Sequence, residues 1–123
     1  MKSALRIALL SLIVGLPAQA HEVETGAIMI CDTQKQVERL GQLFDGKPKP
    51  TIRQVNIEAN DPGACGVADL AYVRGKVLGT VRSKSHTFHV VPVLVVGVNT
   101  EEGVRPVEAA VLFTLVEVRE HAI

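Results

Sequence analysis

TFHVVPVLVVGV, at residues 87–98, is an apolar stretch rich in β-branched residues. A second such stretch, VEAAVLFTLVEV at residues 107–118, follows it across Asn99–Gly103, a segment with the composition of a turn. Together they predict a long β-hairpin. Both carry apolar residues at consecutive positions, so we expect one face to pack on a core and the other to lie under helices or a partner. Pro92 cannot donate a ladder hydrogen bond, which places it at a bulge or on an edge.

Shorter segments of the same kind precede this hairpin. Residues 67–73 and 77–82 are apolar and β-branched, and glycine, asparagine or charged turns separate them from their neighbours. They predict four consecutive, largely antiparallel strands in the second half of the chain. The short apolar run at residues 26–30 predicts one further strand before them.

Helix signals lie between the first predicted strand and the other four. Thr33 followed by Gln36 has the form of a capping box, which marks the start of a helix. Apolar residues then recur at helical spacing, and Gly46 is placed to end the helix. The recurring residues are Val37, Leu40 and Phe44.

The segment Ile52–Glu58 has two interpretations. Pro50 favours a second short helix that begins there and fades by Asn60, whereas Val55 and Ile57 also alternate as they would in a strand. The order of elements predicts an α+β fold, with one short strand and one or two helices followed by a four-stranded meander. We expect a curved five-stranded sheet, barrel-like in its closed form, with the helices over one face or one mouth.

The first twenty residues predict a cleavable secretory signal. Lys2 and Arg6 precede an uncharged run at residues 7–16, and residues 18–20 have the small-x-small form of a cleavage site. The run is shorter than the roughly twenty residues that a membrane-spanning helix needs. We therefore expect residues 21–123 to form one small mature domain, periplasmic or secreted, with no integral membrane segment.

The two cysteines, Cys31 and Cys65, are expected to form a disulfide in such an oxidising compartment. A catalytic redox pair is the alternative. Reactive pairs usually lie in a C-x-x-C turn, whereas these residues are 34 positions apart, so we favour a structural bond.

The charges do not indicate nucleic-acid binding. The whole chain has 13 Lys and Arg against 13 Asp and Glu, and loss of Lys2 and Arg6 with the signal leaves a formal charge of −2. The charges are scattered, and only four aromatic residues are present. Neither a basic stripe nor an aromatic stacking platform is therefore predicted.

Histidines give the sharpest chemical alternative. After cleavage, His21 would offer an α-amine and an imidazole, a chelating pair that suits Cu(II), and His86 or His89 could add a third nitrogen. In an extended strand two residues three apart point to opposite faces, so at most one of the latter pair could join His21. A copper- or zinc-binding protein is thus the alternative function. We favour a polar terminus with two surface histidines and expect no cofactor.

No motif indicates catalysis. The chain lacks a G-x-S-x-G elbow and a phosphate-binding glycine loop, and we read Ser83 and Ser85 beside His86 as a polar turn. Asp69 falls within a predicted strand, where we expect it to be solvated or in a salt bridge rather than catalytic. The sequence therefore does not predict an enzyme.

Five short motifs resemble those of a group of small exported bacterial proteins of unknown function. The likeness covers most of the mature chain, and its motifs are C-D-T at 31–33, Q-V-E-R at 36–39, V-N at 55–56, A-C-G-V-A at 64–68 and Y-V at 72–73. The resemblance implies a structural cysteine pair and a helix over Ile52–Glu58. It implies no activity.

A non-catalytic periplasmic binding domain, stabilised by the disulfide, is the function that we expect. The apolar hairpin is the feature that favours it, because so few helices are available to cover both faces. The hairpin or sheet surface would bind another protein or a cell-envelope component, and a homodimer through the same surface would give the same pattern.

Overall fold

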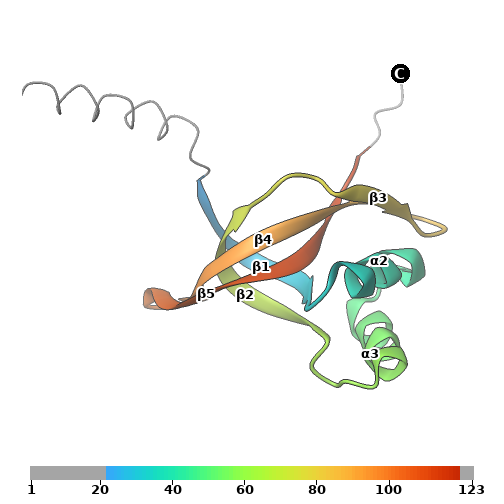
Figure 1. Cartoon of the computed structure of the whole chain (residues 1–123), viewed down its shortest axis with the longest axis horizontal. Coiled ribbons are helices and arrows are strands. Elements are labelled where there is room, and N and C mark those ends of the chain that lie inside the picture. Colours follow the sequence, from blue (N-terminus) through green and yellow to red (C-terminus); the bar gives the residue numbers. More distant parts are fainter. Residues whose placement is uncertain (1–21, 120–123) are drawn as a thin grey trace, which may run out of the picture.

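The computed structural model describes residues 22–119, and the predicted signal at residues 1–20 lies outside them. The class is α+β, as the sequence predicts, and the segment Ile52–Glu58 is helical (Figure 1). The elements in chain order are β1 (Val23–Cys31), α2 (Gln34–Leu43), α3 (Pro48–Ala59), β2 (Cys65–Arg74), β3 (Gly79–Arg82), β4 (Thr87–Thr100) and β5 (Gly103–Glu117).

The five strands form one antiparallel sheet in the order β2-β1-β5-β4-β3, and a further pairing between β2 and β4 bends it into a ring. β4 makes this possible because it has 14 residues. One edge of β4 pairs with β5, while its other edge pairs first with β3 and then with β2. The ring has its shortest strand pairing between β1 and β5, where only Ile30–Thr114 and Cys31–Phe113 are paired.

Strand alternation divides the core into two clusters. One fills the inside of the ring and consists of Leu70, Tyr72, Val93 and Val95, with Ile28, Ile30, Ala68 and Leu112 beside them. The other lies between the helices and the outer face of the sheet. Its members are Cys31, Val37, Leu40, Ile52, Val55, Cys65, Phe88, Val90 and Leu115.

Helix α2 begins where the sequence predicts and ends earlier. Thr33 accepts a bond from the Gln36 N–H, and the Gln36 side chain bonds the Thr33 N–H, each at 3.1 Å, so the capping box is confirmed. The expectation that Gly46 ends the helix is wrong, because Phe44 is already extended. Its ring packs edge-on against Phe88 at 5.4 Å between centroids, which draws the chain out of the helix.

One expectation about the strands is wrong, and the expectation about Pro92 is confirmed. The first strand is not short, because β1 starts at Val23 and pairs with β2 along nine residues. Pro92 lies at a local edge as predicted: the Gly75 N–H donates to its carbonyl at 2.8 Å, so its nitrogen faces the gap between β2 and β3. The bulge of β4 lies further along, at Val96, where the register of β4 with β2 shifts. Within residues 22–119 neither helix is long and apolar enough to cross a membrane.

Candidate functional site

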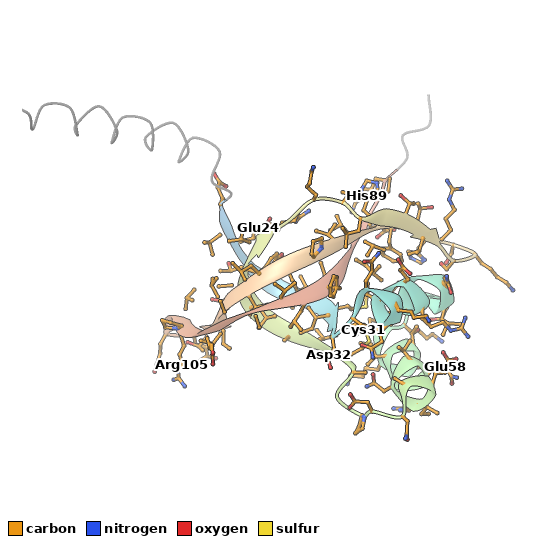
Figure 2. All side chains as sticks on the ribbon, in the orientation of Figure 1. Glu24, Cys31, Asp32, Glu58, His89 and Arg105 are labelled. Carbon is orange, nitrogen blue, oxygen red and sulfur yellow. A yellow bond between two sulfur atoms is a disulfide. The ribbon has the colours of Figure 1, made fainter. Side chains whose placement is uncertain are left out.

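The disulfide between Cys31 and Cys65 joins β1 to β2 where the sheet meets the helices (Figure 2). Both residues are buried, so the bond belongs to the core rather than to a surface site. The predicted structural pair is therefore confirmed as a bond. Its position ties the end of the first strand to the start of the second.

Asn56 of α3 holds the same end of β2 from the other side. Its Oδ1 accepts the Cys65 N–H at 2.8 Å, and its Nδ2 donates to the carbonyls of Cys65 at 3.1 Å and Pro62 at 2.9 Å. The amide thus bonds Cys65 as a residue of a neighbouring strand would. An asparagine side chain carries both an acceptor and donors in one plane. It can therefore bond the N–H and C=O of Cys65 where no neighbouring strand does so.

A groove of about 730 Å³ opens beside this contact, between α3 and the start of β2. Ile57 and Val67 contribute apolar surface to it, and they are 64% and 53% exposed. Lys49 and Arg53 add two cationic side chains from α3. The sequence does not predict this groove, because there Ile57 indicates only that the segment Ile52–Glu58 could be a strand instead of a helix. The only hint is that Ile57, Arg53 and Lys49 are spaced four apart, which puts them on one helix face.

A second surface lies on the outer face of the sheet, beyond the helices. Val23 pairs with Val73, Val73 with Leu94, and Leu94 with Val111, so one row of aliphatic side chains crosses four strands. Val23, Leu94 and Val111 are 57%, 40% and 57% exposed, and Val73 is half-buried. We name these four residues the outer row. They confirm that the predicted hairpin is apolar on both faces.

The free edge of β5 is protected against strand addition. From Gly103 to Leu112 this edge has no neighbouring strand within the described residues, because β1 reaches β5 only near Phe113. Pro106 lies on this stretch, and the register with β4 shifts between Gly97–Pro106 and Val95–Ala110, so residues 107–109 bulge. Proline and bulges both disfavour edge pairing, and Arg105 adds charge beside them (Figure 2). The hairpin therefore offers its face rather than its edge.

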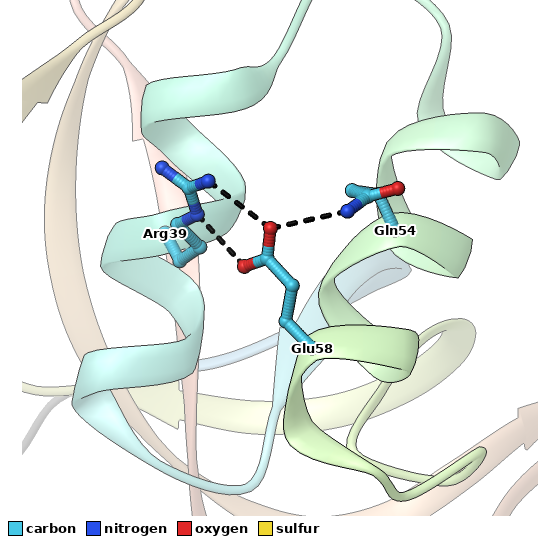
Figure 3. A network of polar contacts seen from close by, with 3 residues as sticks. All are labelled: Arg39, Gln54 and Glu58. Carbon is cyan, nitrogen blue, oxygen red and sulfur yellow. Dashed lines mark hydrogen bonds and ion pairs between the residues drawn. The ribbon is translucent and has the colours of Figure 1, made fainter.

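An ion pair joins the two helices on the side away from the sheet (Figure 3). The Arg39 guanidinium donates to both oxygens of Glu58, at 2.8 and 3.0 Å, and the Gln54 amide donates to the same carboxylate at 3.1 Å. The bond from Arg39 is the main cause that lowers the pKa of Glu58 from 4.5 to about 2, with the bond from Gln54 next. A bidentate pair of this kind orients α3 against α2.

Replacing Glu58 with Gln should change how stability depends on acid. The folded-state pKa of Glu58 lies below its ordinary value of 4.5. The contribution of this carboxylate to stability is therefore fully present above pH 4.5 and is lost as the pH falls towards about 2. We expect the melting temperature of the wild type to fall more steeply over this window than that of Glu58→Gln. Thermal melts from pH 5 to pH 2 measure the difference, and Glu38→Gln, a carboxylate on the neighbouring helix, is the control. Parallel curves for wild type and Glu58→Gln would contradict the assignment.

The histidines are not brought together. His21 lies outside the described residues. The His86 ring packs on Phe44 at 4.9 Å and stacks on Phe88 at 5.8 Å, on the side of β4 that the helices cover. His89 alternates with Phe88 and so lies on the opposite face (Figure 2). Residues 22–119 contain no group of three or more His, Cys, Asp or Glu side chains placed to hold a metal ion.

The other polar residues named in the sequence analysis form hydrogen bonds within turns or between strands. The Ser85 hydroxyl and His86 Nδ1 are 2.7 Å apart in an exposed turn, which Ser83 closes by accepting the His86 N–H at 3.1 Å. Asp69 is exposed, as expected, and accepts a hydrogen bond from the Asn99 amide at 3.1 Å. These contacts explain the residues as parts of turns and strands.

Comparison of this chain with protein-family models, with curated proteins and with solved structures finds no match. The physical features described above are therefore what a functional proposal can rest on.

Proposed function

We propose that this chain is an exported, non-catalytic domain that binds another protein through the outer row, Val23, Val73, Leu94 and Val111. The exposure of this row is the observation that carries the proposal. Soluble monomers rarely leave contiguous apolar side chains in water, and such patches mark interaction sites. The row also contributes to neither core cluster, so the fold does not need these side chains to be apolar.

The predicted secretory signal and the disulfide support a periplasmic or secreted site for this interaction. Disulfides persist in oxidising compartments, and Cys31–Cys65 is buried in the helix-side core. Such a bond restricts the movement of β1 relative to β2 and so favours a rigid binding surface. The native mass of the protein, purified without reductant, reports whether the mature chain begins at His21 and whether two copies associate.

Site-specific photo-crosslinking tests the outer row directly. A photoreactive residue at position 111, in the full chain expressed with its signal in the cell of origin, should give one discrete protein adduct. Adding Leu94→Lys should reduce the adduct at least tenfold, because a charge would then lie in the apolar contact. Val104→Lys, at the tip of the same hairpin and 47% exposed against 40% for Leu94, is the matched control and should leave the adduct unchanged.

The adduct mass identifies the kind of partner. A mass that differs from that of two mature chains supports a different protein, whereas a mass of two chains assigns the row to a homodimer. An adduct that Leu94→Lys leaves unchanged, or the absence of any discrete adduct, would contradict a role for the outer row in binding.

A further inference from the structure

The groove between α3 and β2 lies against a strand edge whose orientation can be worked out residue by residue. In an antiparallel ladder the backbone groups of successive residues point to alternate sides. The Asp32 N–H donates to the Ala64 carbonyl at 2.9 Å, which makes Cys31 and Cys65 a pair without mutual backbone bonds. The N–H and C=O of Cys65 therefore point away from β1, and there the Asn56 amide bonds both.

Val67 repeats this orientation two residues further along β2. Its N–H and C=O point to the same side as those of Cys65, and β4 pairs with β2 only from Leu70 onward. Among residues 22–119 neither group of Val67 has a hydrogen-bond partner. An open strand edge of this kind accepts an extended peptide as an additional strand.

The side chains around this edge define what kind of peptide fits. Ile57 projects from α3 and Val67 from β2, and both are more than half exposed. An aliphatic side chain placed between them would be removed from water by contact with both residues, which favours binding. Arg53 lies one turn and Lys49 two turns before Ile57 on the same helix face. Neither forms an ion pair or side-chain hydrogen bond with a residue in the described part of the chain.

The spacing sets the length of the motif. From Lys49 to Ile57 is eight helical residues, or about 12 Å, which an extended peptide covers in about four residues. A carboxylate on the ligand would meet the cations at one end while an aliphatic side chain meets Ile57 at the other. The helix has no acidic residue in its first turn, and Asp61, the carboxylate that lines the groove, accepts the Gly63 N–H at 2.9 Å.

From these contacts we infer that the α3–β2 groove binds an extended acidic peptide as a strand added to β2. The peptide bonds the N–H and C=O of Val67, places an aliphatic side chain against Ile57, and places a carboxylate, about four residues away, on Lys49 and Arg53. This site is separate from the outer row: Val67 and Val73 are six residues apart on β2, about 20 Å. The Asn56 amide holds Cys65 beside it, so the edge is preformed.

A random heptapeptide library displayed on phage, selected against the whole mature protein with its disulfide intact, tests the inference. The selected sequences should carry Asp or Glu about four residues from Val, Ile or Leu. A synthetic peptide of the selected sequence should bind at least tenfold more weakly to the double variant Lys49→Glu/Arg53→Glu. Its affinity should also fall with added salt, because the charged contact is exposed.

A separate variant, Val67→Pro, tests whether the peptide adds to β2 as a strand. Val67→Pro removes the N–H that points to the open edge and leaves the ladder with β1 intact, since Val67 does not bond across it. We expect at least a fivefold loss of peptide affinity, whereas Val67→Thr should change it less than twofold. Val111→Lys, in the outer row, should have no effect, which separates this test from that of the proposed function.

Hydrogen exchange keeps the inference testable if Val67→Pro fails to fold. In the wild type, the bound peptide should slow exchange of the Val67 amide at least tenfold. The inference is overturned if no sequence is enriched over selection against Lys49→Glu/Arg53→Glu, or if the Val67 amide stays unprotected when the peptide is bound. Enrichment of basic peptides would also overturn it.

Discussion

Replacing Cys31 and Cys65 with alanine is expected to lower the free energy of unfolding by about 4 kcal/mol. The bond closes a loop of 34 positions, and in the chain-entropy model a loop of that length destabilises the unfolded state by about this amount. Small domains are stable by only about 5–15 kcal/mol, so the loss is a large share of the total. The melting temperature should fall by roughly 15–30 °C.

Urea unfolding of the double variant and of the wild type with and without reductant measures this effect. The reduced wild type is the matched control, because it breaks the bond without removing the two sulfur atoms from the core. Both forms should lose similar stability. A loss below about 1 kcal/mol in the reduced wild type would show that contacts around β1 and β2 hold the sheet without the bond.

Several elements follow from the sequence because their signals are local. The start of α2 is set by Thr33 and Gln36, which satisfy each other's backbone groups within four residues. The turn of the β4–β5 hairpin is likewise set by its own residues, with Gly103 at a positive φ of 112°. The disulfide follows from there being two cysteines and a predicted secretory signal. In each case no distant residue is needed to decide the structure.

Other features depend on residues far apart in the chain and could not be read from it. The ring closes because β4 is long enough to hold β3 and β2 on one edge, and strand pairing over such separations leaves no local pattern. The end of α2 depends on Phe44 meeting Phe88, 44 residues later. The same holds for the groove: that Ile57 is exposed, rather than buried with Ile52, depends on how α3 lies against β2.

The candidate surfaces share one cause in the fold. The two short helices cover only the end of the sheet that holds Phe88, Val90 and Leu115, so the apolar face continues into solvent as the outer row. The same helices leave β2 uncovered between Asn56 and the start of its pairing with β4. A domain with more helix would bury both surfaces. Their exposure is thus a consequence of how little of the chain is helical.

Asn56→Ala is expected to lower the free energy of unfolding by about 2–3 kcal/mol. Three hydrogen bonds are lost, and the Cys65 N–H is left without an acceptor in a buried position, which alone costs about 1–3 kcal/mol. Alanine offsets part of this loss through its better helix propensity, by about 0.6 kcal/mol. Gln54→Ala, on the same helix, is the matched control, because its single bond to Glu58 is exposed. It should change stability by less than about 0.5 kcal/mol.

Combining Asn56→Ala with reduction of the disulfide separates the two ways in which Cys65 is held. If the bond and the amide together fix the start of β2, the combined loss should be smaller than the sum of the separate losses by more than about 0.5 kcal/mol, because either loss alone frees the same strand end. Urea unfolding of the four species gives this coupling. Strict additivity would contradict a shared role. Asn56→Asp should be destabilised at least as much as Asn56→Ala near neutral pH, because the carboxylate oxygen that replaces Nδ2 would face the carbonyl oxygens of Cys65 and Pro62 and has no proton to donate to them.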